Sequence, residues 1–296
     1  MRLSLLLLIV ASVAFGAQPV VGTGAEAEKQ AQPVVLPATP ETTVEAPRGW
    51  DESVREGEYQ QPKWSERRRF PGTRTYVAPP GSASFEVWLE NKTPIGGDNR
   101  LRTLYEISFG LGHRLQLDLY LRTEADGQGP MYVESERLEL RYAFADWGVI
   151  PGNPTLYLEW IRQTTGPMKA ELKLLLGGEL SSRLYWGFNL FWERDLWGTP
   201  QTNEYGFTGG LSYSLRDSKF SLGAEARVEL VDTRRRRFDP ESVEVLVGPT
   251  MVWRPISAAN ILLVWFVGPE FAKADAASSY QATFVLQPTL VAGWKF

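Results

Sequence analysis

The chain contains no cysteine and only one histidine, His113, among its 296 residues. A chain without cysteine has no disulfide, no thiolate metal ligand and no cysteine nucleophile. A single histidine does not give the ligand spacings typical of metal sites, and no GxSxG nucleophile motif accompanies it. We therefore expect no catalytic residue, no metal and no cofactor, and we expect that the protein is not an enzyme.

Long apolar runs are also nearly absent, and the mean hydropathy is −0.23. A membrane-spanning helix needs about 20 consecutive apolar residues, and the one apolar run, Leu3–Phe15, is shorter than that. This run follows Met1-Arg2 and ends beside the small residues Gly16 and Ala17, so we expect residues 1–16 to be a secretory signal peptide. The net charge of −4 argues against a nucleic-acid partner.

What the chain has instead is strict two-residue alternation of apolar and polar side chains from Ser82 onward. In the clearest segment Leu115, Leu117, Leu119 and Leu121 alternate with polar residues, which is the pattern of a strand with one apolar face. The alternating segments are Ser84–Glu90, Arg102–Leu111, Arg114–Arg122, Arg137–Phe144, Thr155–Arg162, Lys169–Leu180, Leu184–Arg194, Tyr205–Leu215, Phe220–Leu230, Val243–Trp253, Ile261–Val267 and Gln281–Phe296. Their even number, about 12, predicts an all-β fold over residues 82–296, a transmembrane antiparallel up-and-down β-barrel.

The last segment carries a further signal, because Phe296, Trp294, Leu290 and Phe284 share one face. A half-apolar final strand with a terminal aromatic resembles the closing strand of Gram-negative outer-membrane β-barrels of the porin type. The resemblance implies an outer-membrane location and contact with outer-membrane lipid and lipopolysaccharide. It also implies that Trp294 and Phe296 act as an assembly signal read by the barrel-assembly machinery.

The links between segments alternate in length, as expected for short periplasmic turns and longer external loops. The predicted periplasmic link Asp146–Pro154 is too long for this rule. Pro249 and Pro288 also fall inside strands, where each removes a ladder donor. The run Arg234–Arg237 lies in a predicted external loop, for which we favour a solvated loop over a site for lipopolysaccharide phosphates.

By alternation, many charged side chains face the lumen of the predicted barrel. The expected lumen-lining residues are Glu106, Arg114, Asp118, Arg122, Arg137, Glu139, Arg141, Glu159, Glu171, Lys173, Glu225, Arg227 and Glu229. The expected turn positions pair Asp118 with Arg137 and Glu159 with Lys173. Twelve strands lie between small barrels filled by side chains and large ones with a water-filled channel, so a narrow pore and a filled lumen both stay open.

Residues 17–81 differ from the rest, with nine prolines and no apolar periodicity. Such a segment buries too little apolar surface to offset the entropy of ordering, so we expect it to be disordered and periplasmic. Its second half carries Trp50, Tyr59, Trp64 and the basic run Arg67–Arg69. It is interpreted either as a docking segment or plug that enters the barrel, or as a tether with a solvated basic cluster, and the tether is favoured.

The leading functional hypothesis is a passive, narrow channel for small polar solutes, because charged residues line the predicted lumen. The alternative is a non-conducting scaffold of an envelope trafficking or surface-assembly complex. In that case residues 17–80 bind an envelope protein partner.

Overall fold

The computed structural model describes residues 50–199, 201–233, 239–274 and 279–296. All of these belong to one compact unit, Ala46–Phe296. The expected signal peptide, residues 17–49 and the run Arg234–Arg237 lie outside the described residues.

No helix in the described ranges is both long and apolar enough to span a membrane.

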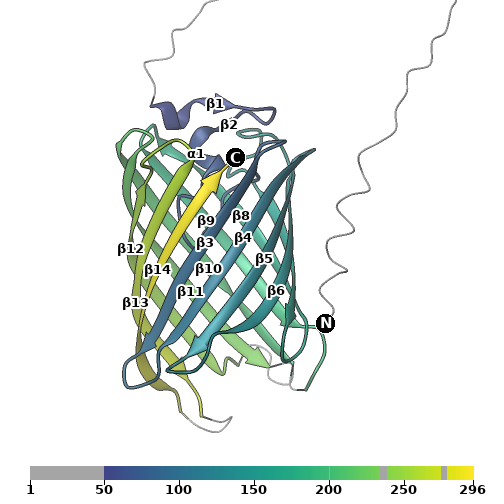
Figure 1. The fold of residues 1–296 in the computed structure, drawn as a ribbon, viewed down its shortest axis with the longest axis vertical. Helices are drawn as coiled ribbons and strands as arrows, with labels where there is room; N and C mark the ends of the chain where they lie inside the picture. The colour runs from purple at the N-terminus through teal and green to yellow at the C-terminus, as the bar shows by residue number, and fades with distance from the viewer. Residues whose placement is uncertain (1–49, 200, 234–238, 275–278) are drawn as a thin grey trace, which may run out of the picture. The chain divides into compact units, whose positions relative to one another are not determined.

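A closed antiparallel barrel of twelve strands forms the body of this unit (Figure 1). Each strand pairs with its neighbours in sequence, and β14 pairs with β3 to close the barrel. The strands are β3 (Ala83–Pro94), β4 (Arg100–Gly112), β5 (Leu115–Asp126), β6 (Tyr132–Ala143), β7 (Thr155–Gln163), β8 (Lys169–Ser181), β9 (Leu184–Asp195), β10 (Thr202–Arg216), β11 (Phe220–Thr233), β12 (Ser242–Trp253), β13 (Ala259–Ala272) and β14 (Gln281–Lys295). All twelve predicted segments are therefore strands, and the predicted fold class is confirmed.

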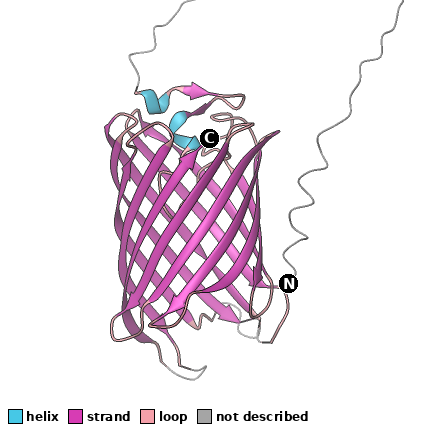
Figure 2. Ribbon diagram, in the orientation of Figure 1, coloured by secondary structure: helices cyan, strands magenta, loops and turns pink. Residues whose placement is uncertain are grey.

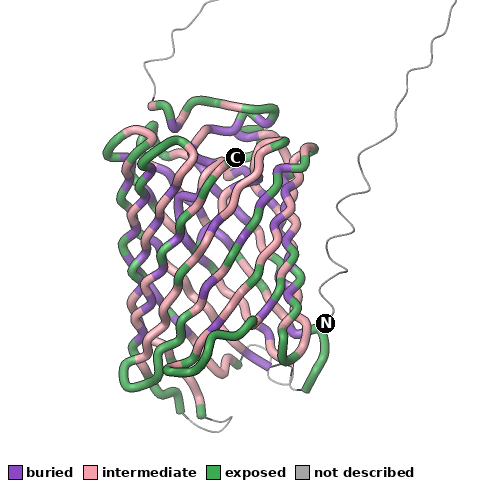
Figure 3. The backbone as a smooth tube through the Cα atoms, in the orientation of Figure 1, coloured by how far each residue is buried: buried purple, intermediate pink, exposed green. Residues whose placement is uncertain are grey.

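Burial alternates along each strand, as the sequence pattern requires (Figure 3). On β9 Leu190 is exposed and Asn189 is buried, and on β13 Trp265 is exposed beside the buried Val264. The outer face is thus a continuous apolar band, while polar backbone groups are satisfied by the closed ladder. These are the two properties that a strand-built structure needs in a bilayer.

The strands run further than predicted toward the end opposite the C-terminus. By the predicted topology that end is external and the C-terminal end is periplasmic. The expected link Asn91–Leu101 shrinks because β3 continues to Pro94 and β4 begins at Arg100. The ladder persists there through residues that are polar on both faces, such as Lys92 opposite Arg100. Alternation of hydrophobicity gives no signal in such a stretch, although the backbone pairing is intact.

Pro249 and Pro288 each interrupt pairing with one neighbouring strand only. Pro249 keeps its partner Ala224 on β11, and Pro288 keeps Trp265 on β13. On the other side the paired residues resume in the same register after each proline. The missing donor therefore leaves a local gap in one ladder, and no bulge is needed.

Residues 50–82 have little regular structure (Figure 2), but many of their side chains are buried. They contain the 3-10 helix η1 (Asp51–Ser53), the two-residue strands β1 (Arg55–Glu56) and β2 (Gln61–Pro62), and the short helix α1 (Lys63–Glu66). These elements lie at the end of the barrel where the C-terminus is found (Figure 1). The prediction of disorder is wrong for residues 50–81, because the barrel supplies the burial that this segment lacks by itself.

Candidate functional site: the lumen and its plug

Residues 50–82, here called the plug, contact the inward face of most of the barrel strands. Trp64 and Phe70 are 1% and 0% exposed, although they belong to a proline-rich segment without apolar periodicity. Arg68 and Arg69 are buried as well. The favoured interpretation of a tether with a solvated basic cluster is therefore wrong for these two arginines, since their charges are compensated by the barrel.

The ion pairs between plug and barrel run in both directions. Plug arginines reach barrel carboxylates, and barrel cations reach plug carboxylates. The pairs are Arg55–Glu179, Arg68–Glu86, Arg68–Glu106, Arg74–Glu106, Lys295–Glu66 and Arg254–Glu52. The plug and the barrel thus neutralise each other's charges, and separating them would leave unpaired charges on both surfaces.

Glu52 is the centre of the most buried of these contacts. Its carboxylate pairs with Arg69 of the plug and with Arg254, which directly follows β12. Ser214 on β10 donates a further hydrogen bond to it. Burial by itself raises the pKa of Glu52, and the guanidinium groups of Arg69 and Arg254 outweigh that effect and hold this pKa below its usual value.

A groove of glycines on three adjacent strands admits the plug. Gly177, Gly187 and Gly210 lie side by side on β8, β9 and β10. A Cβ atom at Gly187 would lie 2.9 Å from the Thr73 side chain, and one at Gly210 would lie 2.5 Å from the ring of Phe70. These separations are shorter than van der Waals contact allows, so only glycine permits this close approach.

Barrel side chains also form hydrogen bonds with the backbone of the plug. The plug contains prolines and has an irregular backbone, so it has no β-ladder of its own to satisfy these groups. Asn189 accepts a hydrogen bond from the Arg74 N–H at 2.8 Å and donates one to the Arg74 carbonyl at 2.7 Å. Asn260 donates to the carbonyl of Arg68 at 2.9 Å. Glu225 accepts from the Gly72 N–H at 3.2 Å, so buried backbone groups of the plug are satisfied by the wall.

An aromatic cluster explains the long periplasmic link that broke the length rule. Trp147 lies in this link, with its ring 5.4 Å from that of Trp64 and 5.1 Å from that of Tyr76, both of the plug. The Trp147 N–H donates to the carbonyl of Tyr59 at 2.9 Å. Burial, reinforced by the charge of Asp146, raises the pKa of Tyr76. The link is long because it forms one side of the plug's binding site.

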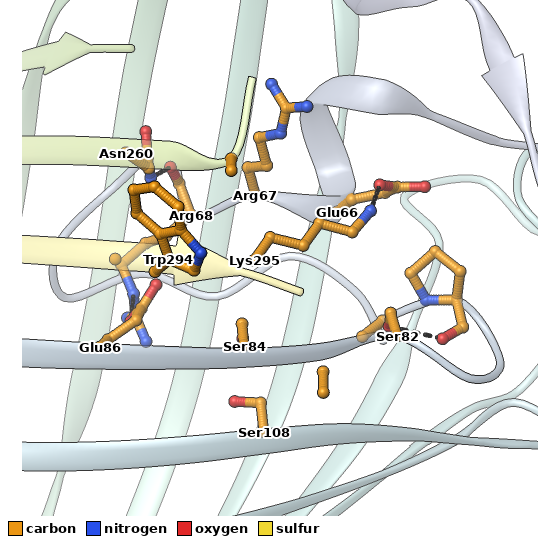
Figure 4. Close-up of a pocket in the computed structure, with 15 residues that line it drawn as sticks. Glu66, Arg67, Arg68, Ser82, Ser84, Glu86, Ser108, Asn260, Trp294 and Lys295 are labelled. Atoms are coloured by element: carbon orange, nitrogen blue, oxygen red, sulfur yellow. Dashed lines mark hydrogen bonds and ion pairs between the residues drawn. The ribbon is translucent and has the colours of Figure 1, made fainter. Parts of the chain in front are cut away.

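The contact between plug and wall leaves little free space. One cavity of about 40 Å³ lies between Arg68, Glu86 and the β14 end (Figure 4). A second, of about 50 Å³, is lined by Arg74, Glu106 and other residues of plug and wall. Each has room for only a few water molecules. The plug and the wall are therefore in close contact around these residues.

The external half of the lumen is different. Its charges pair within the barrel wall, for example Arg102 with Glu90 at 3.1 Å and Arg137 with Glu159 at 3.3 Å. The Arg102 and Glu90 side chains are 25% and 22% exposed, compared with 2% and 1% for Arg68 and Glu106 beside the plug. The external half is thus a charged vestibule whose side chains are in part exposed.

One side of the inner wall is apolar. Val285 on β14 packs with Leu246, Val264 and Phe266 on β12 and β13, and all four are buried. Val285 is one of the two residues that break the polar alternation of the last strand, and the other, Val291, packs with Val252 and Leu262. These apolar residues face the lumen, where they form a wall that carries no charge.

The predicted lumen-lining residues are distributed as follows. On the inward faces lie Glu106, Asp118, Arg122, Arg137, Glu139, Arg141, Glu159, Glu171, Lys173, Glu225, Arg227 and Glu229. Arg114 is an exception, since it occupies a two-residue turn with His113, has a φ of 60°, and pairs with Asp146 at 3.1 Å. It therefore lies at the periplasmic rim.

The two predicted ion pairs are wrong, because each residue lies opposite a position two residues away from its predicted partner. Asp118 lies opposite Glu139 and pairs with Arg141 at 2.7 Å. Glu159 lies opposite Glu171, and Lys173 pairs with Glu171 at 2.9 Å. The turn positions assumed from sequence were displaced, and a displacement of two residues keeps each side chain on its face but changes its partner.

Sequence reasoning missed the uncharged residues that hold the plug, namely Asn189, Asn260 and the glycines of the groove. A signal for them was present, since inward glycines recur on three consecutive strands. At the other end of the chain, Trp294 and Phe296 are exposed at the end of β14, and the Phe296 N–H donates to the carbonyl of Ala83.

The barrel, its apolar outer band and its charged lumen define an outer-membrane β-barrel, in agreement with the predicted class and location. No protein-family profile and no curated protein matches the chain significantly in sequence. Among solved structures, it is similar to an outer membrane channel from Pseudomonas putida F1, with a TM-score of 0.51 and 12% identity over 77% of this chain and 100% of that one. It is also matched by the NanC porin, with a TM-score of 0.48 and 9% identity over 70% of this chain and 98% of that one. At these identities the likeness concerns the fold.

Proposed function

We propose that the protein is an outer-membrane channel for small polar solutes, and that the plug closes it in the state described. The observation that carries this proposal is the contrast inside the lumen. A vestibule lined with paired, partly exposed charges leads from the external end to the close contact with residues 50–82. Similarity to a protein described as an outer membrane channel supports the same function.

The geometry of the vestibule suits small polar solutes. Its wall carries both signs of charge, with Lys92 between Glu244 and Glu270 on one side and Lys169 between Glu193 and Glu204 on another. A lining of this kind replaces part of the hydration shell of a polar solute and disfavours an apolar one. Size and polarity, rather than a built-in chemical reaction, determine what passes.

The glycine groove provides a way to remove the plug without removing residues. Gly187→Val places a branched side chain where Thr73 and Thr75 now lie, while valine itself is well suited to a strand. We expect the plug to leave the lumen and the full-length protein to show stable unitary currents in planar bilayers. The unsubstituted protein should be closed for most of the time.

Gly209→Val is the matched control, since Gly209 adjoins Gly210 on β10 but has the Phe188 ring at 3.4 Å as its nearest contact. This variant should behave as the unsubstituted protein does. The proposal is contradicted if Gly187→Val inserts as a folded barrel with an accessible plug and still carries no current.

The buried plug also favours a second candidate function, a non-conducting scaffold. In that case residues 50–82 are a permanent core of the barrel, and the channel assay gives no current in either variant. Contacts with lipopolysaccharide, the barrel-assembly machinery or an envelope protein stay predictions.

A further inference from the structure

One wall of the lumen binds two guanidinium groups of the plug around a single tryptophan. Trp88 faces inward on β3, and the Arg68 guanidinium carbon lies 4.0 Å from its ring centroid. The guanidinium carbon of Arg74 lies 5.9 Å from the same centroid. Both distances are within the range of cation–π attraction.

Two carboxylates complete the binding of these guanidinium groups. Arg68 donates to Glu86 at 2.7 Å and to Glu106 at 2.9 Å. Arg74 donates to the other oxygen of Glu106 and approaches the Tyr120 hydroxyl at 3.4 Å. An aromatic face flanked by two carboxylates is a complete recognition site for a planar, delocalised cation.

The barrel compensates these carboxylates only in part, because Arg141 of the wall attracts both without forming an ion pair with either, and Ser108 donates a hydrogen bond to Glu106. Within the described residues, every ion pair of Glu86 and Glu106 is made with a plug arginine. The neighbouring carboxylates Asp118 and Glu139 instead pair with Arg141 of the wall. When the plug leaves, Glu86 and Glu106 lose their ion-pair partners, and the wall cation that still attracts them is Arg141.

We propose that Glu86, Trp88, Glu106 and Tyr120 form a binding site for organic cations that carry a guanidinium group, and that Arg68 and Arg74 occupy it while the channel is closed. This inference rests on the proposed channel function. It makes the plug a competitor of the solute, so that a guanidinium-bearing solute entering from the vestibule favours the open state.

The chemistry of the site distinguishes such a solute from a metal cation. A potassium ion is spherical and has no hydrogen-bond donors, so it makes no directional hydrogen bonds to two carboxylates. A guanidinium group donates in its plane to carboxylates and presents a flat face to an indole ring. The proposed site therefore binds organic guanidinium compounds well above the affinity expected from charge alone.

The direct test uses potassium current through full-length Gly187→Val, with agmatine as the probe because it carries one guanidinium and one ammonium group. We expect agmatine to block the current from the vestibule side in a concentration-dependent way. Adding Glu106→Gln should raise the half-blocking concentration about tenfold, since a charge-assisted hydrogen bond is lost. Trp88→Leu, which keeps both carboxylates, should weaken the block in the same direction and serves if the glutamine variant does not fold.

Glu136→Gln is the control, because Glu136 is an exposed carboxylate on the outward face of β6 that pairs with Arg162. It should leave the block unchanged. If potassium current is present but agmatine blocks no better than an equal concentration of sodium, or if Glu106→Gln and Trp88→Leu have no effect, the cation site is refuted while the channel stands. Absence of any potassium current refutes the channel itself.

A second measurement uses the unsubstituted protein. Because agmatine competes with Arg68 and Arg74 for the same groups, millimolar agmatine should increase the frequency of channel openings. Potassium chloride at equal ionic strength should not, which separates competition from screening of the plug's ion pairs. An equal response to both salts contradicts the proposed competition.

Discussion

The two halves of the lumen satisfy their charges in different ways. In the external half, partners lie on neighbouring barrel strands, as with Arg102 and the carboxylates Glu90 and Glu124. In the periplasmic half, many partners lie in the plug, 18 to 229 residues away, as with Arg68 and Glu86 or Lys295 and Glu66. The external half is therefore complete without the plug, whereas the periplasmic half requires it.

Because of this difference, substitutions in one half should change the stability of the barrel, and substitutions in the other half should change the binding of the plug in the lumen. In the periplasmic half, removing one residue of a buried ion pair leaves a buried charge uncompensated, which costs much free energy. Removing one in the vestibule leaves a charge that water and salt can screen. The four predictions below use this contrast, from the largest expected effect to the smallest.

Glu52→Gln should have the largest effect, because it leaves Arg69 and Arg254 without their shared carboxylate. Breaking a buried pair in this way costs about 3–5 kcal/mol. We expect the plug to leave its site, so that trypsin cleaves the folded protein at plug arginines at least about 100-fold faster. The barrel should keep its heat-modifiable migration on gels.

Glu66→Gln is the matched control for this prediction. Glu66 pairs with Lys295, whose side chain is 33% exposed, so its loss is largely compensated by water. Equal rates of cleavage in the two variants would refute the central role given to Glu52.

Acidification should weaken the same contact. The pKa of Glu52 lies below the usual value of 4.5, so its carboxylate stabilises the seated plug fully above about pH 4.5. This stabilisation is lost as the pH falls through the lowered value. Bilayer recordings of the unsubstituted protein and of Glu52→Gln should therefore differ in open time from pH 7 to about 4.5 and converge below that range. A difference that disappears between pH 7 and 5 would contradict this assignment.

Asn189→Leu should have an intermediate effect, since it removes both hydrogen bonds to the backbone of Arg74. Two lost bonds to buried backbone groups cost about 2 kcal/mol in plug seating. Hydrogen exchange at the Arg74 amide should accelerate by about 30-fold, while amides of the barrel strands are unaffected. Asn203→Leu, at the external end of β10, should leave exchange at Arg74 unchanged.

Lys92→Met should have the smallest effect, although Lys92 contacts two carboxylates, Glu244 and Glu270. All three groups belong to the vestibule, so we expect a loss of about 1 kcal/mol or less in barrel stability. Urea titration in lipid vesicles measures this loss, and trypsin sensitivity of the plug should not change. A released plug in this variant would show that the two halves are coupled, against the comparison drawn above.

Most of the barrel could be predicted from sequence, because alternation reports which face of a strand meets lipid. All twelve strands and the inward position of residues such as Asp118 and Glu159 followed from this signal. Register did not, since hydrophobic alternation is unchanged by a slip of two residues. The pairs of Asp118 and Glu159 were therefore assigned to the wrong partners.

The plug could not be predicted in the same way, because its order comes from the barrel. Residues 50–82 have no apolar periodicity, and Phe70 and Arg68 are buried against barrel residues such as Gly210 and Glu106. The indirect signals were on the barrel, in the inward glycines Gly177 and Gly187 and in the long link that contains Trp147. Each of these features is unexpected in a barrel with an empty lumen, and contact with the plug explains it.

The central claim, that residues 50–82 close the lumen from within, is tested most directly by a reversible cross-link. The hydroxyl oxygens of Thr73 on the plug and Thr208 on β10 lie 2.9 Å apart, so the sulfur atoms of Thr73→Cys with Thr208→Cys need about 1 Å of adjustment to form a disulfide. The chain has no other cysteine to interfere. In planar bilayers we predict that the oxidised protein is cross-linked and silent, and that reduction restores openings. A protein that fails to cross-link, or that conducts equally when cross-linked and when reduced, would contradict the claim.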